Sequence, residues 1–173
     1  MIEPHGATEL KPLYVACAEQ RRSLESEAQR LPSLKISSAS AANAVMLGAG
    51  YFTPLSGFMD QRDMASVAAT MHTADGLFWP VPVVNLVQQC SYRTGDRIAL
   101  RDPNIEGNPV LAVQDVASVE ELSDKDLESA IQSIYGTLDR NHPGVNVFST
   151  QGRALVSGPI TVLNYSYFAQ VYP

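Results

Sequence analysis

Three histidines, His5, His72 and His142, are the side chains of this 173-residue sequence best suited to proton transfer near neutral pH. A catalytic histidine needs a carboxylate that orients it and a nucleophile that it serves, whereas each of these stands isolated. We therefore favour structural roles for all three. His72 follows a helix-like stretch and would interact with the helix dipole. His142 precedes Pro143-Gly144 and would bond to that turn, and His5 belongs to a mobile or loosely docked end.

The carboxylates are scattered and form no acid–base pair in the sequence. Asp124 and Asp126 stand at the start of a predicted helix, where free backbone N–H groups stabilise negative charge. Asp102, Glu106 and Asp115 flank a predicted hairpin, and we expect them to be solvated turn residues.

Phosphate-binding and nucleophile motifs are incomplete. No glycine is followed by Lys-Ser or Lys-Thr at the spacing of a phosphate-binding loop. Gly48-x-Gly50 lacks the third glycine of a dinucleotide fingerprint, and Leu55-Ser56-Gly57 lacks the first glycine of a nucleophile elbow. Cys17 and Cys90 have no partner at metal-ligand spacing, so we expect two buried, reduced thiols, with a disulfide between them left open. The sequence thus predicts no catalytic, cofactor-binding or metal-binding residue in this chain.

Composition limits the class of protein. The chain is 45% hydrophobic and 17% charged, which predicts one folded domain, or two small ones that share a core. Its net charge of -6 repels polyanions, so we expect no nucleic-acid partner. The start, MIEPHGATELKP, is no signal peptide, and no apolar stretch reaches the roughly 18 residues of a membrane span. We therefore expect a cytoplasmic protein without a membrane partner.

Helical patterns dominate the first half of the chain. We predict a helix over 17–30 that Pro32 stops, then a short strand over 34–37. A second helix, capped by Ser38 or Ser40, should end at 48–50. A third should start at Asp60 with Asp63. Apolar residues at i, i+3, i+4 and i+7 predict the buried stripes of these last two helices: Ala42, Val45, Met46 and Ala49, and Met64, Val67, Ala68 and Met71.

Strand patterns dominate the second half. Strands are predicted over 78–87, 97–101, 110–116 and 154–163, with a last helix over 123–134 that Ser123 caps. Pro80 and Pro82 cannot donate to a ladder, so the first strand should lie at an edge or begin irregularly. This order favours an α+β fold with a partly closed, mixed, barrel-like sheet and helices mainly in the first half.

The loop GYFTPLSGFMD, residues 50–60, is unusually apolar for a connection between helices. In one interpretation Phe52, Leu55, Phe58 and Met59 form a plug that closes the core. In the other the loop faces a neighbouring domain. We favour the plug, and the two can both hold. Trp79, the only tryptophan, is predicted to be largely buried against this loop.

Five motifs together resemble the N-terminal domain of the ATP sulfurylase (sulfate adenylyltransferase) family. They are GYFTPLSGFMD, DGLFWPVPVVNLV, GDRIALRDPNIEGNPVLAVQDV, YGTLDRNHPGV and SGPITVLN. Their order and spacing match along essentially the whole chain. The sequence of the loop at 50–60, together with AANAVM at 41–46 before it, is most similar to the sequences of enzymes from sulfur-metabolising bacteria.

The resemblance implies a PUA-like fold for residues 1–173, a small mixed β-barrel elaborated with helices, with 164–173 beginning a linker to a catalytic domain. It implies that the whole enzyme transfers the adenylyl group between ATP and sulfate, giving adenosine 5'-phosphosulfate and pyrophosphate, or runs in reverse. The catalytic residues, Mg-ATP and sulfate would belong to the following domain, whose Gln-Thr-Arg-Asn-Pro motif is not in these 173 residues. The implied partners are that domain in cis and further copies of the enzyme in a homo-oligomer.

A stand-alone PUA-like binding or regulatory module is the alternative interpretation. PUA-like folds elsewhere often bind RNA. The acidic balance and the lack of a basic, aromatic-interleaved face argue against that partner.

Overall fold

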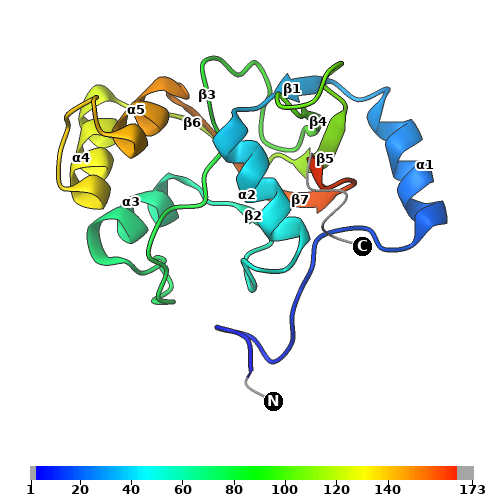
Figure 1. Cartoon of the computed structure of the whole chain (residues 1–173), viewed down its shortest axis with the longest axis horizontal. Coiled ribbons are helices and arrows are strands. Elements are labelled where there is room, and N and C mark those ends of the chain that lie inside the picture. Colours follow the sequence, from blue (N-terminus) through cyan, green and yellow to red (C-terminus); the bar gives the residue numbers. More distant parts are fainter. Residues whose placement is uncertain (1–2, 167–173) are drawn as a thin grey trace.

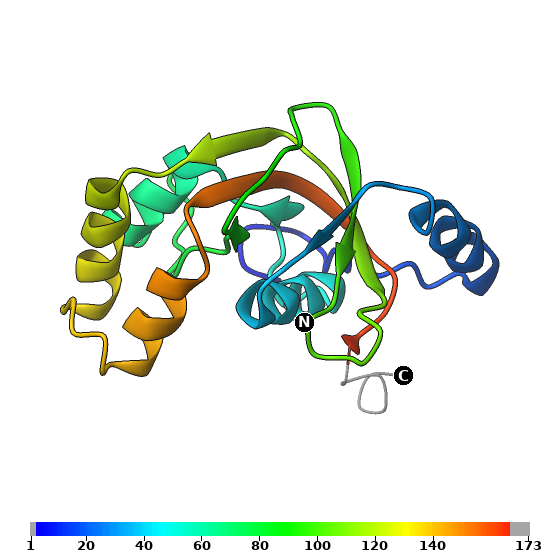
Figure 2. The same ribbon diagram turned by 90° about the horizontal axis from the view of Figure 1, so that it is seen from above.

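The structure is a computed structural model that describes residues 3–166. Its helices are α1 (Ala18–Ala28), α2 (Ser38–Gly48), α3 (Gln61–Thr70), α4 (Asp124–Tyr135) and α5 (Pro143–Thr150). Its strands are β1 (Ser33–Lys35), β2 (Gly57–Phe58), β3 (Leu86–Val87), β4 (Arg97–Arg101), β5 (Val110–Asp115), β6 (Ser118–Glu121) and β7 (Ala154–Val162). A curled sheet forms the centre, with α3, α4 and α5 at one end and α1 at the other (Figures 1 and 2).

The sheet is organised around β7. The strand order is β1-β4-β5-β7-β2, and β3 and β6 also pair with β7. All pairs with β7 are antiparallel, whereas β1 and β4 are parallel. The sheet is therefore mixed and curls upon itself, as the strand pattern predicted. β7 has strand partners along its whole length, and seven of its nine residues are buried.

Two apolar clusters hold the sheet in place. The larger lies inside the curl and joins the sheet to α2, α3, α4 and α5. The smaller joins α1 to the other face of β4 and β5, with Leu24, Ala28 and Leu31 facing Ala99 and Val113. These three residues therefore form the face that α1 and its C-terminal end turn toward the sheet.

Hydroxyl or carboxylate side chains cap the starts of α2, α3 and α4. The Asp60 carboxylate accepts from the N–H of Asp63 at 2.8 Å, and the Ser123 hydroxyl accepts from the N–H of Asp126 at 3.2 Å, as predicted. For α2 the cap is Ser37, which accepts from the N–H of Ser40 at 3.0 Å, so the prediction of Ser38 or Ser40 was wrong.

The buried face of α2 also differs from the predicted stripe. Ala42 is exposed and Met46 and Ala49 are only half-buried, although Val45 is buried. The face turned inward carries mostly small residues: Ser40, Ala41, Ala44, Val45, Leu47 and Gly48. A Cβ on Gly48 would stand 2.8 Å from Val162 Cγ1, so small side chains let α2 lie close on β7. In α3, Met64, Val67 and Ala68 are buried as predicted, whereas Met71 lies past the helix end and is exposed.

Three other elements differ from the predictions. Residues 78–85 are irregular and only Leu86–Val87 forms a strand, because Pro80 and Pro82 supply no ladder donors. The short strands β2 and β6 were not predicted. Residues 142–144, predicted as a turn, begin α5, with Pro143 in the first turn and His142 as the cap.

The burial of one carboxylate and of both cysteines differs from the predictions. Asp102 is fully buried rather than solvated, with Oδ1 accepting from the N–H of Asn104 at 2.8 Å, whereas Glu106 and Asp115 are exposed as expected. Cys17 is exposed and Cys90 half-buried, so the prediction of two buried thiols was wrong, and both are free. Between residues 3 and 166, no helix is long and apolar enough to cross a membrane.

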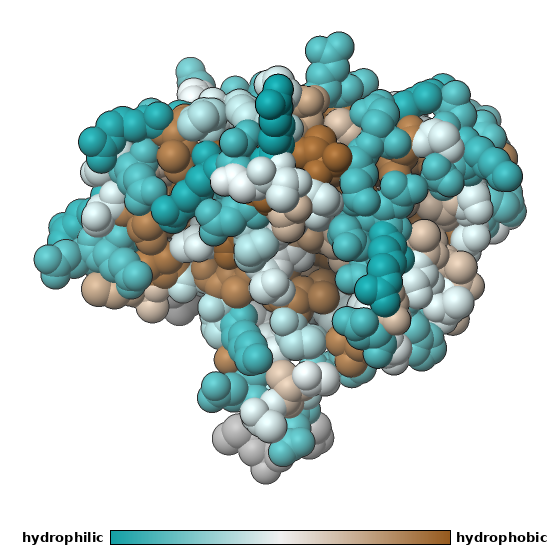
Figure 3. Space-filling model, turned by 180° about the vertical axis from the view of Figure 1, so that it is seen from behind, coloured by the Kyte–Doolittle hydropathy of each residue, from teal (hydrophilic) through white to brown (hydrophobic). Residues whose placement is uncertain are grey.

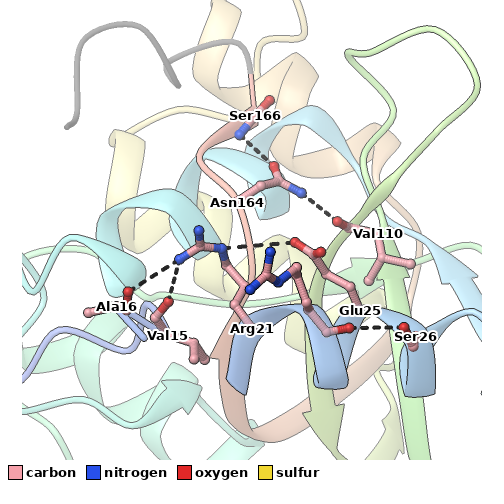
Figure 4. A network of polar contacts seen from close by, with 9 residues as sticks. Val15, Ala16, Arg21, Glu25, Ser26, Val110, Asn164 and Ser166 are labelled. Carbon is pink, nitrogen blue, oxygen red and sulfur yellow. Dashed lines mark hydrogen bonds and ion pairs between the residues drawn. The ribbon is translucent and has the colours of Figure 1, made fainter. Parts of the chain in front are cut away.

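The segment that precedes α1 lies beside the C-terminal end of the described chain, where the ring of Tyr14 stacks on Tyr165 with centroids 4.4 Å apart. The Arg21 guanidinium donates to the carbonyl oxygens of Val15 at 2.9 Å and Ala16 at 3.4 Å (Figure 4). The side-chain amide of Asn164 donates to the carbonyl of Val110 and accepts from the N–H of Ser166 (Figure 4). Hydrogen bonds therefore fix the segment just before α1 and the end of the described chain. The expected linker over 164–173 lies mostly outside the described residues.

Candidate functional site

A surface groove of about 430 Å³ opens between the N-terminal segment, the loop after α2 and the irregular segment before β3. We call it the aromatic groove and define it by His5, Tyr51, Phe52, Phe78, Trp79 and Val81. It is built from the loop at 50–60 that the sequence singled out and from a segment that two prolines keep out of the sheet.

The floor of the aromatic groove is buried, and its rim is not. Trp79 is buried and meets the Phe52 ring edge to face, with ring centroids 5.8 Å apart, which confirms its predicted place against the loop. Phe58 and Met59 are buried beneath, so the plug interpretation is confirmed for them. Phe52 and Leu55 are half-buried and Tyr51 is exposed. The loop thus closes the core with one part and presents a surface with the other.

The polar groups of the groove hold its own walls together. His5 Nε2 lies 2.7 Å from the carbonyl oxygen of Phe78. The Thr53 hydroxyl donates to the carbonyl of Gly50 at 2.7 Å and accepts from the N–H of Lys11 at 3.0 Å. These bonds fix the loop, the N-terminal segment and the Phe78 segment relative to one another. The groove therefore offers aromatic rings for contact rather than groups poised for proton transfer.

Each of the three histidines places a ring nitrogen against a backbone group of the domain. His5 is docked on Phe78 and Trp79 rather than loosely attached, because its ring centroid lies 6.3 Å and 6.2 Å from theirs. His72 Nδ1 lies 2.8 Å from the carbonyl oxygen of Thr70 at the end of α3, as its structural interpretation predicted. His142 Nδ1 accepts from the N–H of Val145 at 3.4 Å. The structure brings His5 and His72 together only through the ring of Phe78.

A larger groove of about 600 Å³ lies between β1, the start of α2, β3 and α5. Its polar side chains are engaged with one another. The hydroxyl of Ser37 donates to Gln151 Oε1 at 2.7 Å, and the side-chain amide of Gln88 donates to the carbonyl of Thr150 at 2.7 Å. These contacts join α5 to the sheet, so we assign this groove a structural role.

Metal ligands do not gather in the part of the chain that the structure describes. Within residues 3–166, no three His, Cys, Asp or Glu side chains converge so that they could hold a metal ion. The expectation that this chain carries no catalytic, cofactor or metal residue stays a prediction.

Cys17 is exposed at the surface, and the pKa of its thiol is lowered. It stands just before α1, and the backbone N–H groups of Gln20 and Glu19 in the first turn of this helix lower the pKa of its thiol. Because the pKa is lower in the folded state, ionisation of this thiol favours folding above the unfolded-state pKa. That contribution is lost as the pH falls through the folded-state pKa.

We expect Cys17 to react with iodoacetamide at lower pH in the folded protein than in the urea-unfolded protein, because the thiolate is the reactive form. Mass spectrometry of the rate against pH measures both midpoints, and Cys17→Ser identifies the signal of Cys90. Equal midpoints in the two states would show that α1 does not stabilise the thiolate.

A family model described as "PUA-like domain" matches residues 2–165. The chain is 56% identical over its whole length to the sulfate adenylyltransferase of Alcanivorax borkumensis, of which it covers 43%. It is 53% identical to that of Allochromatium vinosum, again over its whole length, and covers 44% of it. The chain therefore spans less than half the length of these curated relatives.

Solved structures also match. The structure described as "Hexameric APS kinase from Thiobacillus denitrificans" superimposes with a TM-score of 0.65 and 26% sequence identity. That match covers 94% of this chain and 27% of the solved chain.

Proposed function

Because the chain belongs to the family of PUA-like domains, we propose that it forms the N-terminal domain of a sulfate adenylyltransferase. The whole enzyme would join ATP and sulfate into adenosine 5'-phosphosulfate and pyrophosphate, or catalyse the reverse. The identity of 56% and 53% to two sulfate adenylyltransferases along the whole chain carries this proposal. Conversion of sulfate would belong to sulfur metabolism and, since ATP takes part in either direction, to the cytoplasm.

In this proposal the chain supports catalysis without supplying reacting groups. The histidines bond to backbone groups of the domain itself, and the grooves are built from apolar rings and internally engaged amides and hydroxyls. Mg-ATP and sulfate would be bound by the following domain of the same polypeptide. Assembly of the whole enzyme into a homo-oligomer is proposed as well, in line with the structural neighbour, which is described as hexameric.

The 173-residue chain is expected to fold but to show no turnover, whereas the full-length protein releases pyrophosphate from ATP and sulfate. A pyrophosphate-release assay on both proteins measures this, and calorimetry with Mg-ATP measures binding. Clear turnover by the 173-residue chain would show that catalytic groups lie within it. An inactive full-length protein would contradict the proposed function itself.

A further inference from the structure

The rim of the aromatic groove exposes large apolar side chains at one place. Tyr51 is 61% exposed, Phe78 49% and Val81 48%. These residues come from two segments that border the same groove. Aromatic residues are enriched at the centres of protein interfaces, and gathered apolar surface marks interaction sites. On the face that Figure 3 shows, hydrophobic residues form separate patches within a mostly hydrophilic surface.

Backbone hydrogen bonds hold the walls of the aromatic groove in place. The N–H of Met59 donates to the carbonyl of Val83 at 2.8 Å, and the N–H of Trp79 donates to the carbonyl of Met71 at 2.8 Å. Together with the contact of His5 on the carbonyl of Phe78, these bonds fix both walls. A preformed surface of this kind loses little conformational entropy when a partner docks on it.

The described end of the chain is linked to the groove through the N-terminal segment. The ring of Tyr165 stacks on Tyr14, with centroids 4.4 Å apart. From Tyr14 the N-terminal segment runs back to Lys11, whose N–H donates to Thr53 in the loop that lines the groove. Tyr165 therefore packs on the same N-terminal segment that contacts the loop of the groove.

We propose that the aromatic groove is the docking surface for the rest of the same polypeptide, which would seat an apolar segment over Tyr51, Phe78 and Val81. This inference rests on the proposed function. The curated relatives carry more than half of their length outside the part that this chain matches, so ample chain is available to cover the groove. A tethered segment also has a high effective concentration, which favours docking in cis over docking of a second copy.

Site-specific cross-linking in the full-length protein tests the proposal. Val81→p-benzoylphenylalanine places a photoreactive ring on the rim of the groove. Val147→p-benzoylphenylalanine is the matched control, because Val147 is also 48% exposed and lies on α5, which does not line the aromatic groove. After irradiation, gel electrophoresis separates cross-links within one chain from cross-links between chains, and mass spectrometry identifies the joined peptides.

We expect position 81 to join a peptide from beyond residue 173 of the same chain, and position 147 to give no such product. A product of twice the chain mass would assign the groove to a second copy and overturn the proposal. Absence of any product at position 81, or equal yields at both positions, would overturn it too. Pyrophosphate release by the same preparations is scored separately, since an active enzyme without the cross-link refutes the docking surface and leaves the proposed function intact.

Discussion

Gly158→Ala is expected to destabilise the domain by at least about 3 kcal/mol, which places it among the most damaging single substitutions. Gly158 has φ +134, where a side chain is strained, and its Cβ would stand 2.2 Å from the carbonyl oxygen of Asp115. The backbone nitrogen of Ala117 is only 2.7 Å from the same point. Both obstacles are backbone atoms at the passage from β5 to β6, so they cannot move away as a side chain would.

Gly76→Ala is the matched control for Gly158→Ala. Gly76 also has a positive φ, +89, but its Cβ would meet nothing within 4 Å. Only the backbone strain remains, which costs about 1–2 kcal/mol. Urea unfolding followed by the emission of Trp79, the only tryptophan of the 173-residue chain, measures both variants. Equal losses at the two glycines would show that β7 has room at Gly158.

Phe58→Ala is expected to cost about 3–5 kcal/mol, the usual range for emptying a buried aromatic site. Phe58 is 4% exposed, belongs to the main apolar cluster and pairs with Gly158 across β2 and β7. Loss of the ring would leave a cavity in the main apolar cluster and weaken the pairing of β2 with β7.

The same urea experiment on Phe78→Ala provides the control. Phe78 is half exposed on the rim of the aromatic groove, so its removal from the 173-residue chain should cost less than about 1 kcal/mol. If Phe58→Ala costs no more than this, the plug does not stabilise the domain, and the loop at 50–60 serves only as a surface.

Sequence reasoning succeeded where local signals and tertiary structure agree. The strands β4, β5 and β7 are apolar runs bounded by turn residues, and the structure places them within about one residue of the prediction. The helices α3 and α4 were found because Asp60 and Ser123 cap them before an apolar face of helical period.

Sequence reasoning failed where packing overrides local preference. The helix α5 contains Pro, Gly, two Val, Asn and Ser, which are all weak helix formers in water. It is helical because Val145 and Phe148 are buried in the main cluster. The strand β6, with sequence SVEE, has hardly any apolar pattern and is defined by its pairing with β7.

The candidate site could be predicted only in part. The apolar loop at 50–60 and the burial of Trp79 against it were readable, because a connecting loop needs a reason to carry such residues. The docking of His5 was not, since Phe78 lies 73 positions away and no local pattern links them. The burial of Asp102 was hidden in the same way, because the turn sequence that surrounds it is typical of solvated loops.

The central place of β7 has a consequence for the order of events during synthesis. Among the strands of the described chain, β2, β3 and β6 have no partner except β7, which is the last strand to be made. Until Val162 has left the ribosome, these segments expose unpaired edges and most of the apolar surface that β7 later covers. The nascent chain therefore cannot close its barrel from the N-terminus onward. Closure of the sheet has to wait until β7 is made. During this period chaperones can bind the unpaired edges of the earlier strands.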